Sequence, residues 1–103
     1  MDVELLYIAE CPNWRHTLDE LRGVMAARGV TADVRLVEVK TWAQARRLRF
    51  GGSPTVRVDG RDVDPAGGPP VYGVECRLYL VAGKPAGAPP REWMDEAVRA
   101  GAR

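Results

Sequence analysis

The chain has 103 residues, a length that suits a single domain with one hydrophobic core. Hydrophobic residues make up 46% of it and charged residues 28%, which are the proportions of an ordinary globular protein. The formal net charge is only +1, so there is no electrostatic reason to expect nucleic acid or an anionic membrane as a partner.

The N-terminal part of the sequence carries no membrane or export signal. Its longest apolar run, residues 5–9, is far too short to span a bilayer, and no basic segment precedes it. These features predict a cytoplasmic protein. In a reducing cytosol, the two cysteines are expected to be chemically active thiols rather than a structural disulfide.

The first half of the chain alternates between strand and helix patterns. Residues 3–8, VELLYI, are β-prone and almost wholly apolar, as in a central strand of a parallel sheet. Apolar residues then recur at helical spacing over 12–29. A second strand is predicted over 33–39, and a short helix over 42–50 that Thr41 caps.

The second half begins with a hairpin pattern. Residues 53–63 predict two short strands joined by an Asp59-Gly60 turn, and residues 64–75, rich in Gly and Pro, predict a loop. Residues 76–81 suit one more strand at the edge of the sheet. A last helix is predicted over 91–100, behind a proline.

The resulting order is β-α-β-α-β-β-α, with one extra edge strand allowed by residues 76–81. A strand–helix–strand start demands a right-handed parallel crossover, and the hairpin adds an antiparallel edge. We therefore expect an α/β fold with a mixed sheet flanked by helices. Three tryptophans at helical positions are expected in the core, namely Trp14, Trp42 and Trp93. The acidic residues after the hairpin turn, Asp62 and Asp64, are expected in solvent.

Cys11 stands where the first strand ends and the first helix begins. Pro12 suits the first helical position, because its missing N–H would be unpaired there and its φ is already helical. The N-terminus of a helix favours an anion, and a thiolate is one. This position predicts a Cys11 that is at least partly exposed and whose pKa lies below the free-thiol value of about 8.5; the alternative is a small buried residue that closes the strand.

The element order and the CPNW motif at 11–14 resemble the thioredoxin-like superfamily, in which a C-x-x-C motif follows a central strand. GGSPTVRV at 51–58 is a second match, since thioredoxin-like proteins carry a cis-proline before their third strand, facing the active cysteine. The resemblance implies a single thioredoxin-like domain over 1–103 and a cis Ser53–Pro54 bond against Cys11. It also implies a substrate site made of Pro12, Asn13, Trp14, Ser53 and Pro54. More narrowly, the chain is similar to short bacterial thioredoxin-like proteins that carry the label alkylmercury lyase.

The chain departs from that motif at Trp14, which occupies the place of the second cysteine and cannot resolve a mixed disulfide. If Pro54 faces Cys11, the hairpin runs away from the site and back, so the loop over 65–75 should hang on the site side. Cys76 ends this loop and is expected near Cys11, as a distal resolving thiol or a second soft-metal ligand. The alternative is a small buried residue that opens the edge strand.

Three functions follow from these features. The first is thiol–disulfide exchange by a thiol–disulfide oxidoreductase, with Cys11 as nucleophile, Cys76 as its partner, and a protein or glutathione as thiol or disulfide substrate. The second is binding of a soft metal ion or an organomercurial by Cys11 and Cys76; lyase chemistry would also need an acid, and Glu10 is the only carboxylate beside Cys11. The third is a non-catalytic binding module with a groove beside Pro54.

Other candidate groups are weaker. His16, the only histidine, lies about 140° around the helix from Cys11, and two distant cysteines make no zinc pattern. No cofactor and no conventional metal site are expected. Asn13 suits either the helix start or a hydrogen bond near the thiolate, and Trp14 suits either the core or the wall of a thiol pocket.

Overall fold

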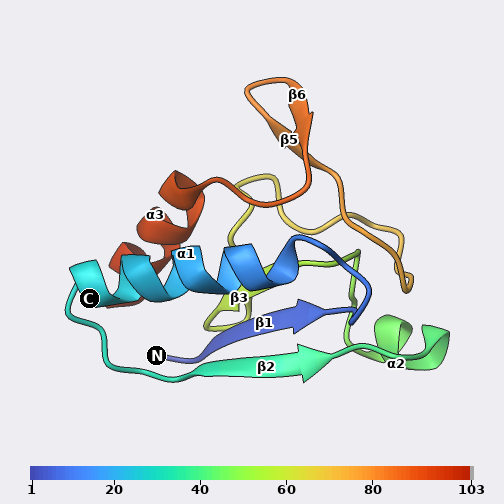
Figure 1. Cartoon of the computed structure of the whole chain (residues 1–103), viewed down its shortest axis with the longest axis horizontal. Helices are drawn as coiled ribbons and strands as arrows, with labels where there is room; N and C mark the ends of the chain where they lie inside the picture. The colour runs from blue at the N-terminus through green and yellow to red at the C-terminus, as the bar shows by residue number, and fades with distance from the viewer. Residues whose placement is uncertain (103) are drawn as a thin grey trace.

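The computed structural model describes residues 1–102. Within these residues, four strands form one mixed sheet in the order β2-β1-β3-β4, accompanied by three helices (Figure 1). The strands are β1 (Val3–Tyr7), β2 (Val34–Glu38), β3 (Thr55–Val58) and β4 (Arg61–Asp62), and the helices are α1 (Trp14–Ala27), α2 (Trp42–Arg47) and α3 (Arg91–Gly101). The predicted α/β class, with a mixed sheet and helices, is confirmed.

Strand β1 is central and pairs on both sides. It runs parallel to β2 and antiparallel to β3, so that Leu5 stands opposite Leu36 on one side and Val56 on the other. Leu5 and Val56 are both fully buried, at 0% exposure. This central position explains why residues 3–8 are apolar almost throughout.

The turn between β3 and β4 is the predicted hairpin. Asp59 and Gly60 have φ values of 52° and 80°, the two positive angles that a type I′ turn requires. Asp and Gly tolerate this left-handed region better than other residues do, which is why the DG pair predicts the turn from sequence.

Helices α1 and α3 lie side by side over the sheet (Figure 1). Helix α1 turns one apolar stripe inward, and α3 contributes Met94 and Val98, both at 0% exposure. The stripe of α1 consists of Trp14, Leu18, Leu21, Val24 and Met25. Together with β1 and β3, these side chains form a single hydrophobic core.

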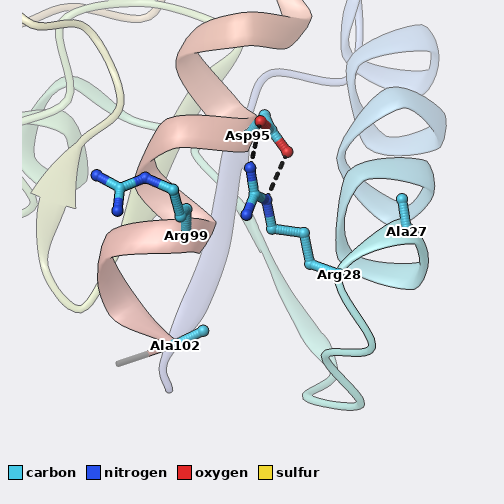
Figure 2. A pocket seen from close by; sticks show the side chains of 5 residues that line it. All are labelled: Ala27, Arg28, Asp95, Arg99 and Ala102. Carbon is cyan, nitrogen blue, oxygen red and sulfur yellow. Dashed lines mark hydrogen bonds and ion pairs between the residues drawn. The ribbon is translucent and has the colours of Figure 1, made fainter.

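Arg28 joins the far end of α1 to α3. Its guanidinium donates to both carboxylate oxygens of Asp95, at 2.7 and 2.8 Å (Figure 2). The hydrogen bond from Arg28 lowers the pKa of Asp95 below its usual value, because it stabilises the ionised carboxylate. The shallow hollow around them is lined by Ala27, Arg28, Asp95, Arg99 and Ala102. Since its arginine and aspartate satisfy each other, we assign this hollow a packing role.

A row of charged residues crosses the sheet. Glu4 of β1 pairs with Arg35 of β2 at 2.8 Å and lies 3.8 Å from Arg57 of β3. These residues are direct neighbours in the strand register, where opposite charges stabilise a sheet modestly. The polar row explains why β1 contains one glutamate within its apolar run.

The strand predicted at the sheet edge forms, but in a different place. Strand β5 (Tyr79–Val81) pairs with β6 (Lys84–Ala86) in a separate two-stranded hairpin that projects from the body (Figure 1). The prediction of an extra edge strand in the main sheet is therefore wrong. Ala82 and Gly83, with φ of 51° and 80°, make a tight turn that favours pairing with the next segment.

Trp42 is a further correction. It was expected in the core, yet it is 58% exposed at the start of α2. The short α2 buries Ala45 instead, and the Trp42 ring lies against Gly73 of the long loop. Within residues 1–102, no helix is long and apolar enough to cross a membrane.

The two ends of the molecule differ. β1 and β2 both point toward the end where α2 lies, while the N-terminus and the last turn of α3 lie at the opposite end (Figure 1). The segment that follows β1 and carries Cys11 is at the α2 end, where the carboxyl ends of the two parallel strands meet. In α/β sheets this end is where functional groups gather.

Candidate functional site

Cys11 lies in the turn that joins β1 to α1. Its N–H donates to the carbonyl of Ile8 over 3.1 Å, which turns the chain out of the sheet. Helix α1 begins at Trp14 with Asn13 as its N-cap residue, so Pro12 precedes the cap and is exposed. The prediction that Pro12 is the first helical residue is wrong, because the turns around Cys11 take up the residues before Asn13.

The Cys11 thiol is buried, with 2% exposure. Its Sγ donates to the carbonyl of Ser53 at 3.5 Å and accepts the N–H of Asn13 at 3.4 Å. Asn13 therefore begins the helix and also contacts the sulfur, so both roles considered for it are present. The expectation of an exposed Cys11 is wrong, because the chain leading into β3 lies over the thiol.

The Ser53–Pro54 bond is cis and lies against Cys11, as predicted. The Ser53 hydroxyl accepts the N–H of Ile8 at 3.1 Å, which ties this loop to the end of β1. Ser53 and Pro54 are both buried. Binding of a substrate by these two residues stays a prediction, since in this structure they contact the chain itself.

Cys76 comes to the same place from the other side of Ser53. The two residues form a parallel β-bridge, in which the N–H of Ser53 donates to Glu75 at 2.8 Å and the N–H of Arg77 donates to Ser53 at 2.9 Å. The carbonyl of Ser53 thus accepts from both Arg77 and the Cys11 thiol. Both cysteines are free thiols, and Cys76 is exposed.

The two thiols influence each other electrostatically. The pKa of Cys76 is raised, first by the partial burial of its sulfur, then by the charge of Cys11 and a hydrogen bond with it, and last by Glu75. Both cysteines also contact Ser53, Cys11 through its thiol and Cys76 through the backbone bridge. The structure therefore brings together the two cysteines that lie far apart in sequence.

The residue after Cys76 was not anticipated as part of the site. Arg77 is buried, and its guanidinium contacts both oxygens of Asp62 at 2.7 and 3.2 Å and one oxygen of Asp64 at 3.4 Å. It also donates to the hydroxyl of Thr55 at 3.3 Å. The prediction that Asp62 and Asp64 are solvated is wrong, because their side chains are only 11% and 16% exposed.

Tyr79 completes this buried network. The Arg77 guanidinium lies 4.1 Å from the centre of the Tyr79 ring, and the Tyr79 hydroxyl donates to the carbonyl of Pro54. Burial raises the pKa of Tyr79 far above its usual value, so its hydroxyl keeps its proton and donates. The segment from Cys76 to Tyr79 is therefore fixed to Ser53 and Pro54 by side chains as well as by the backbone.

Gly52 allows the two segments to approach. It has a φ of 129°, and a Cβ placed on it would lie 2.7 Å from both the Cα and the Cβ of Arg77. Any larger residue would push Arg77, and with it Cys76, away from Ser53. Gly51 and Gly52 follow the helix predicted over 42–50, and the close backbone approach at Gly52 is a reason for glycine that the sequence does not reveal.

Trp14 stacks on Tyr7, with ring centres 4.1 Å apart and the planes inclined at 24°. It is 9% exposed, and the guanidinium of Arg15 covers its other side at 4.5 Å. Its buried Nε1–H has no partner among the described residues. Of the two roles considered for Trp14, the contacts favour packing in the core.

Metal ligands are sparse around the two cysteines. Residues 1–102 contain no group of three or more His, Cys, Asp or Glu side chains that could hold an ion. His16 is exposed on α1 and pairs with Glu20 at 3.5 Å. The two cysteines by themselves supply two sulfur ligands, which suits only a soft metal ion with two-coordinate geometry.

Comparisons with protein-family models, curated proteins and solved structures find no significant match to this chain. The chemical class of the site therefore has to be inferred from the geometry of its own residues: a buried and an exposed thiol, joined by one serine that precedes a cis-proline.

Proposed function

We propose that the protein is a thioredoxin-like thiol protein that carries out thiol–disulfide exchange, with Cys11 and Cys76 as its redox pair. One observation carries the proposal: Cys11 and Cys76 both contact Ser53, one through its thiol and the other through a β-bridge. Cysteines so far apart in sequence come close to the same residue only because the fold brings them there. Dithiol–disulfide exchange requires such a pair of thiols.

The backbone supports the thioredoxin-like part of the proposal. Its strand order β2-β1-β3-β4, with β1 and β2 parallel, a cysteine after β1 and a cis-proline before β3, has the element order on which the resemblance rests. The second cysteine of the C-x-x-C motif is replaced by Trp14, and Cys76 supplies the missing sulfur from a distant part of the chain.

The expected substrate is a disulfide or thiol of a protein or of glutathione, in the cytoplasm, where glutathione and thioredoxin keep thiols reduced. One thiolate of the pair attacks the substrate disulfide and releases a first thiolate, and the other cysteine attacks the resulting mixed disulfide and releases the second. The N–H of Asn13, 3.4 Å from Sγ of Cys11, is in place to donate to its thiolate. The reduced pair gives up two electrons and becomes one disulfide.

Soft-metal binding is the second candidate, because the same neighbouring thiols would suit a two-coordinate ion such as Cu(I) or Hg(II). It requires both sulfurs in their reduced form. Titration with Cu(I) in the presence of a competing chelator separates the two functions: binding that needs both cysteines supports the metal role, and binding retained by Cys76→Ser contradicts it.

The exchange function is tested with one equivalent of an aromatic disulfide whose thiolate is coloured on release. The wild-type protein should release both aromatic thiolates and end as a species lighter by two hydrogens, without an adduct. Each single variant, Cys11→Ser or Cys76→Ser, should release one and keep the other as an adduct. A wild-type protein that keeps the adduct contradicts the dithiol mechanism.

A further inference from the structure

We infer that Cys76 is the thiol that first attacks a disulfide substrate, and that Cys11 then resolves the mixed disulfide from within the protein. The inference rests on the proposed exchange function and assigns the order in which its two thiols act. It reverses the order that the CPNW motif predicts, in which Cys11 at the start of the helix would meet the substrate.

The difference in access carries this assignment. Cys11 is 2% exposed and lies among the core residues, whereas Cys76 is exposed. An attacking sulfur must approach a disulfide in line with the bond it breaks, so the substrate needs open space in front of it. Only Cys76 offers this space without local unfolding.

The hydrogen bonds of Cys11 suit the second step rather than the first. Its Sγ is held between the carbonyl of Ser53 and the N–H of Asn13. These contacts fix the sulfur in one position inside the protein, on the same serine that forms the β-bridge with Cys76. A fixed sulfur is ready to attack a neighbour that becomes a disulfide, which is the task of a resolving thiol.

The backbone that carries the exposed thiol is also held in place. The residues on either side of Cys76 bond to the backbone of Ser53, and Arg77 is anchored by Asp62 and Asp64. Cys76 can therefore take up a substrate on its open side while the side facing Cys11 keeps its position. The raised pKa of Cys76 lowers its thiolate fraction at neutral pH but makes each thiolate a stronger nucleophile.

The Cys76 thiolate attacks one sulfur of the substrate R–S–S–R′; the S–S bond breaks, and R′S⁻ leaves with the electron pair. The Cys11 thiolate then attacks Sγ of Cys76 in the mixed disulfide, and RS⁻ leaves. The two cysteine protons go to the two leaving thiolates. The protein has been oxidised to a Cys11–Cys76 disulfide, and the substrate has been reduced to two thiols.

The test compares the rates at which single-thiol variants react with glutathione disulfide and with the aromatic disulfide. Cys11→Ser, which keeps Cys76, should form its mixed disulfide at least as fast as the first wild-type phase, because the loss of Cys11 lowers the pKa of Cys76. Cys76→Ser, which keeps Cys11, should be slower by about tenfold or more, since its buried sulfur reacts only after local opening. In concentrated urea, where both variants are unfolded, they should react at similar rates, because both sulfurs are then equally accessible.

Cys11→Ala is a second variant that keeps only Cys76, and it removes the buried sulfur without adding a hydroxyl to the core. It should react with the disulfides as Cys11→Ser does. If Cys76→Ser reacts as fast as Cys11→Ser or faster in the folded state, the assigned order is overturned. If the variants differ as expected but the wild type never releases the second thiolate, the exchange function fails and Cys76 is only an accessible thiol. The two failures are thus distinguishable.

Discussion

At the scale of single residues, Ser53 connects the parts of the site. Its carbonyl accepts from Cys11 and Arg77, its N–H donates to Glu75, and its hydroxyl accepts from Ile8. Every polar group of this one buried residue is used to bring β1, the cis-proline loop and the Cys76 segment together. The relative position of the two thiols follows from these bonds.

The reactivity of Cys76 should depend on pH in a way that reveals its neighbour. Burial, the charge and hydrogen bond of Cys11, and Glu75 all raise its pKa, so alkylation should accelerate as pH rises above the usual thiol range of about 8–9. Cys11→Ser removes two of these causes and should move the midpoint to lower pH. Rates of iodoacetamide labelling, assigned to Cys76 by peptide mass, measure it.

Glu75→Gln is the matched control for this experiment. Glu75 raises the pKa of Cys76 less than Cys11 does, so its removal should lower the midpoint by a smaller amount. An unchanged midpoint in Cys11→Ser would show that the two sulfurs are not neighbours in solution.

At the scale of elements, the segment from Cys76 into β5 has an unusual alternation. Arg77 and Tyr79 point inward, while Leu78 and Leu80 are 70% and 66% exposed. Burial alone would lower the pKa of Arg77, but the hydrogen bond to Asp62 and the surrounding negative charges raise it, so the side chain stays charged. The buried arginine anchors the segment that carries the exposed thiol.

Arg77→Met should destabilise the protein strongly. It leaves Asp62 and Asp64 largely buried without a cation, and breaking a buried ion pair in this way costs about 3–5 kcal/mol. The free energy of unfolding in urea measures the loss. Adding Asp62→Asn and Asp64→Asn should restore part of it, because no uncompensated charge then remains.

Arg35→Met is the comparison for that variant. Arg35 also pairs with acidic residues but is 58% exposed, so its loss should cost less than about 1 kcal/mol. Equal losses for the two arginines would mean that the network of Arg77 does not anchor the segment.

Gly52→Ala should separate the two segments of the site. The added methyl would lie 2.7 Å from Arg77, at a φ of 129° that side chains rarely adopt, and such strain costs about 1–3 kcal/mol. Disulfide formation between Cys11 and Cys76 should slow in this variant. Gly83→Asn, at a positive φ with open space around it, should leave that rate unchanged; a similar slowing in both would contradict the role of Gly52.

At the scale of the whole molecule, the sequence predicts the backbone better than the site. The apolar run of β1, the stripe of α1 and the Asp59-Gly60 turn are local patterns, and the structure contains all of them. The burial of Cys11 and of Arg77 depends on segments distant in sequence that meet over Ser53. No local pattern carries that information.

A signal for the Arg77 network is nevertheless present in the sequence. Asp62 lies in the second strand of the hairpin and Asp64 follows two residues later, so an extended chain would place both carboxylates on one face. If other residues cover this face, its two carboxylates need a cation. Arg77, which stands between Cys76 and Leu78, is the candidate. The two carboxylates stand next to a hairpin turn, where acidic residues are usually solvated, so the local pattern alone does not indicate this pairing.

Oxidation should stabilise the whole fold. A Cys11–Cys76 disulfide closes a loop of about 65 residues, for which the chain-entropy model gives about 4 kcal/mol. The midpoint of urea unfolding should therefore be higher for the oxidised protein than for the reduced one. Equal midpoints would indicate that the disulfide distorts the native structure by as much as it constrains the unfolded chain.

The most direct measurement is the mass of peptides from protein equilibrated in glutathione buffers of graded redox potential and digested without reduction. The proposed dithiol predicts a linked Cys11–Cys76 peptide whose fraction follows a single two-electron transition, with a tenfold change in equilibrium constant for about every 30 mV, and which disappears on reduction. Only glutathione adducts on Cys11 or Cys76, with no linked peptide at any potential, would contradict the exchange function.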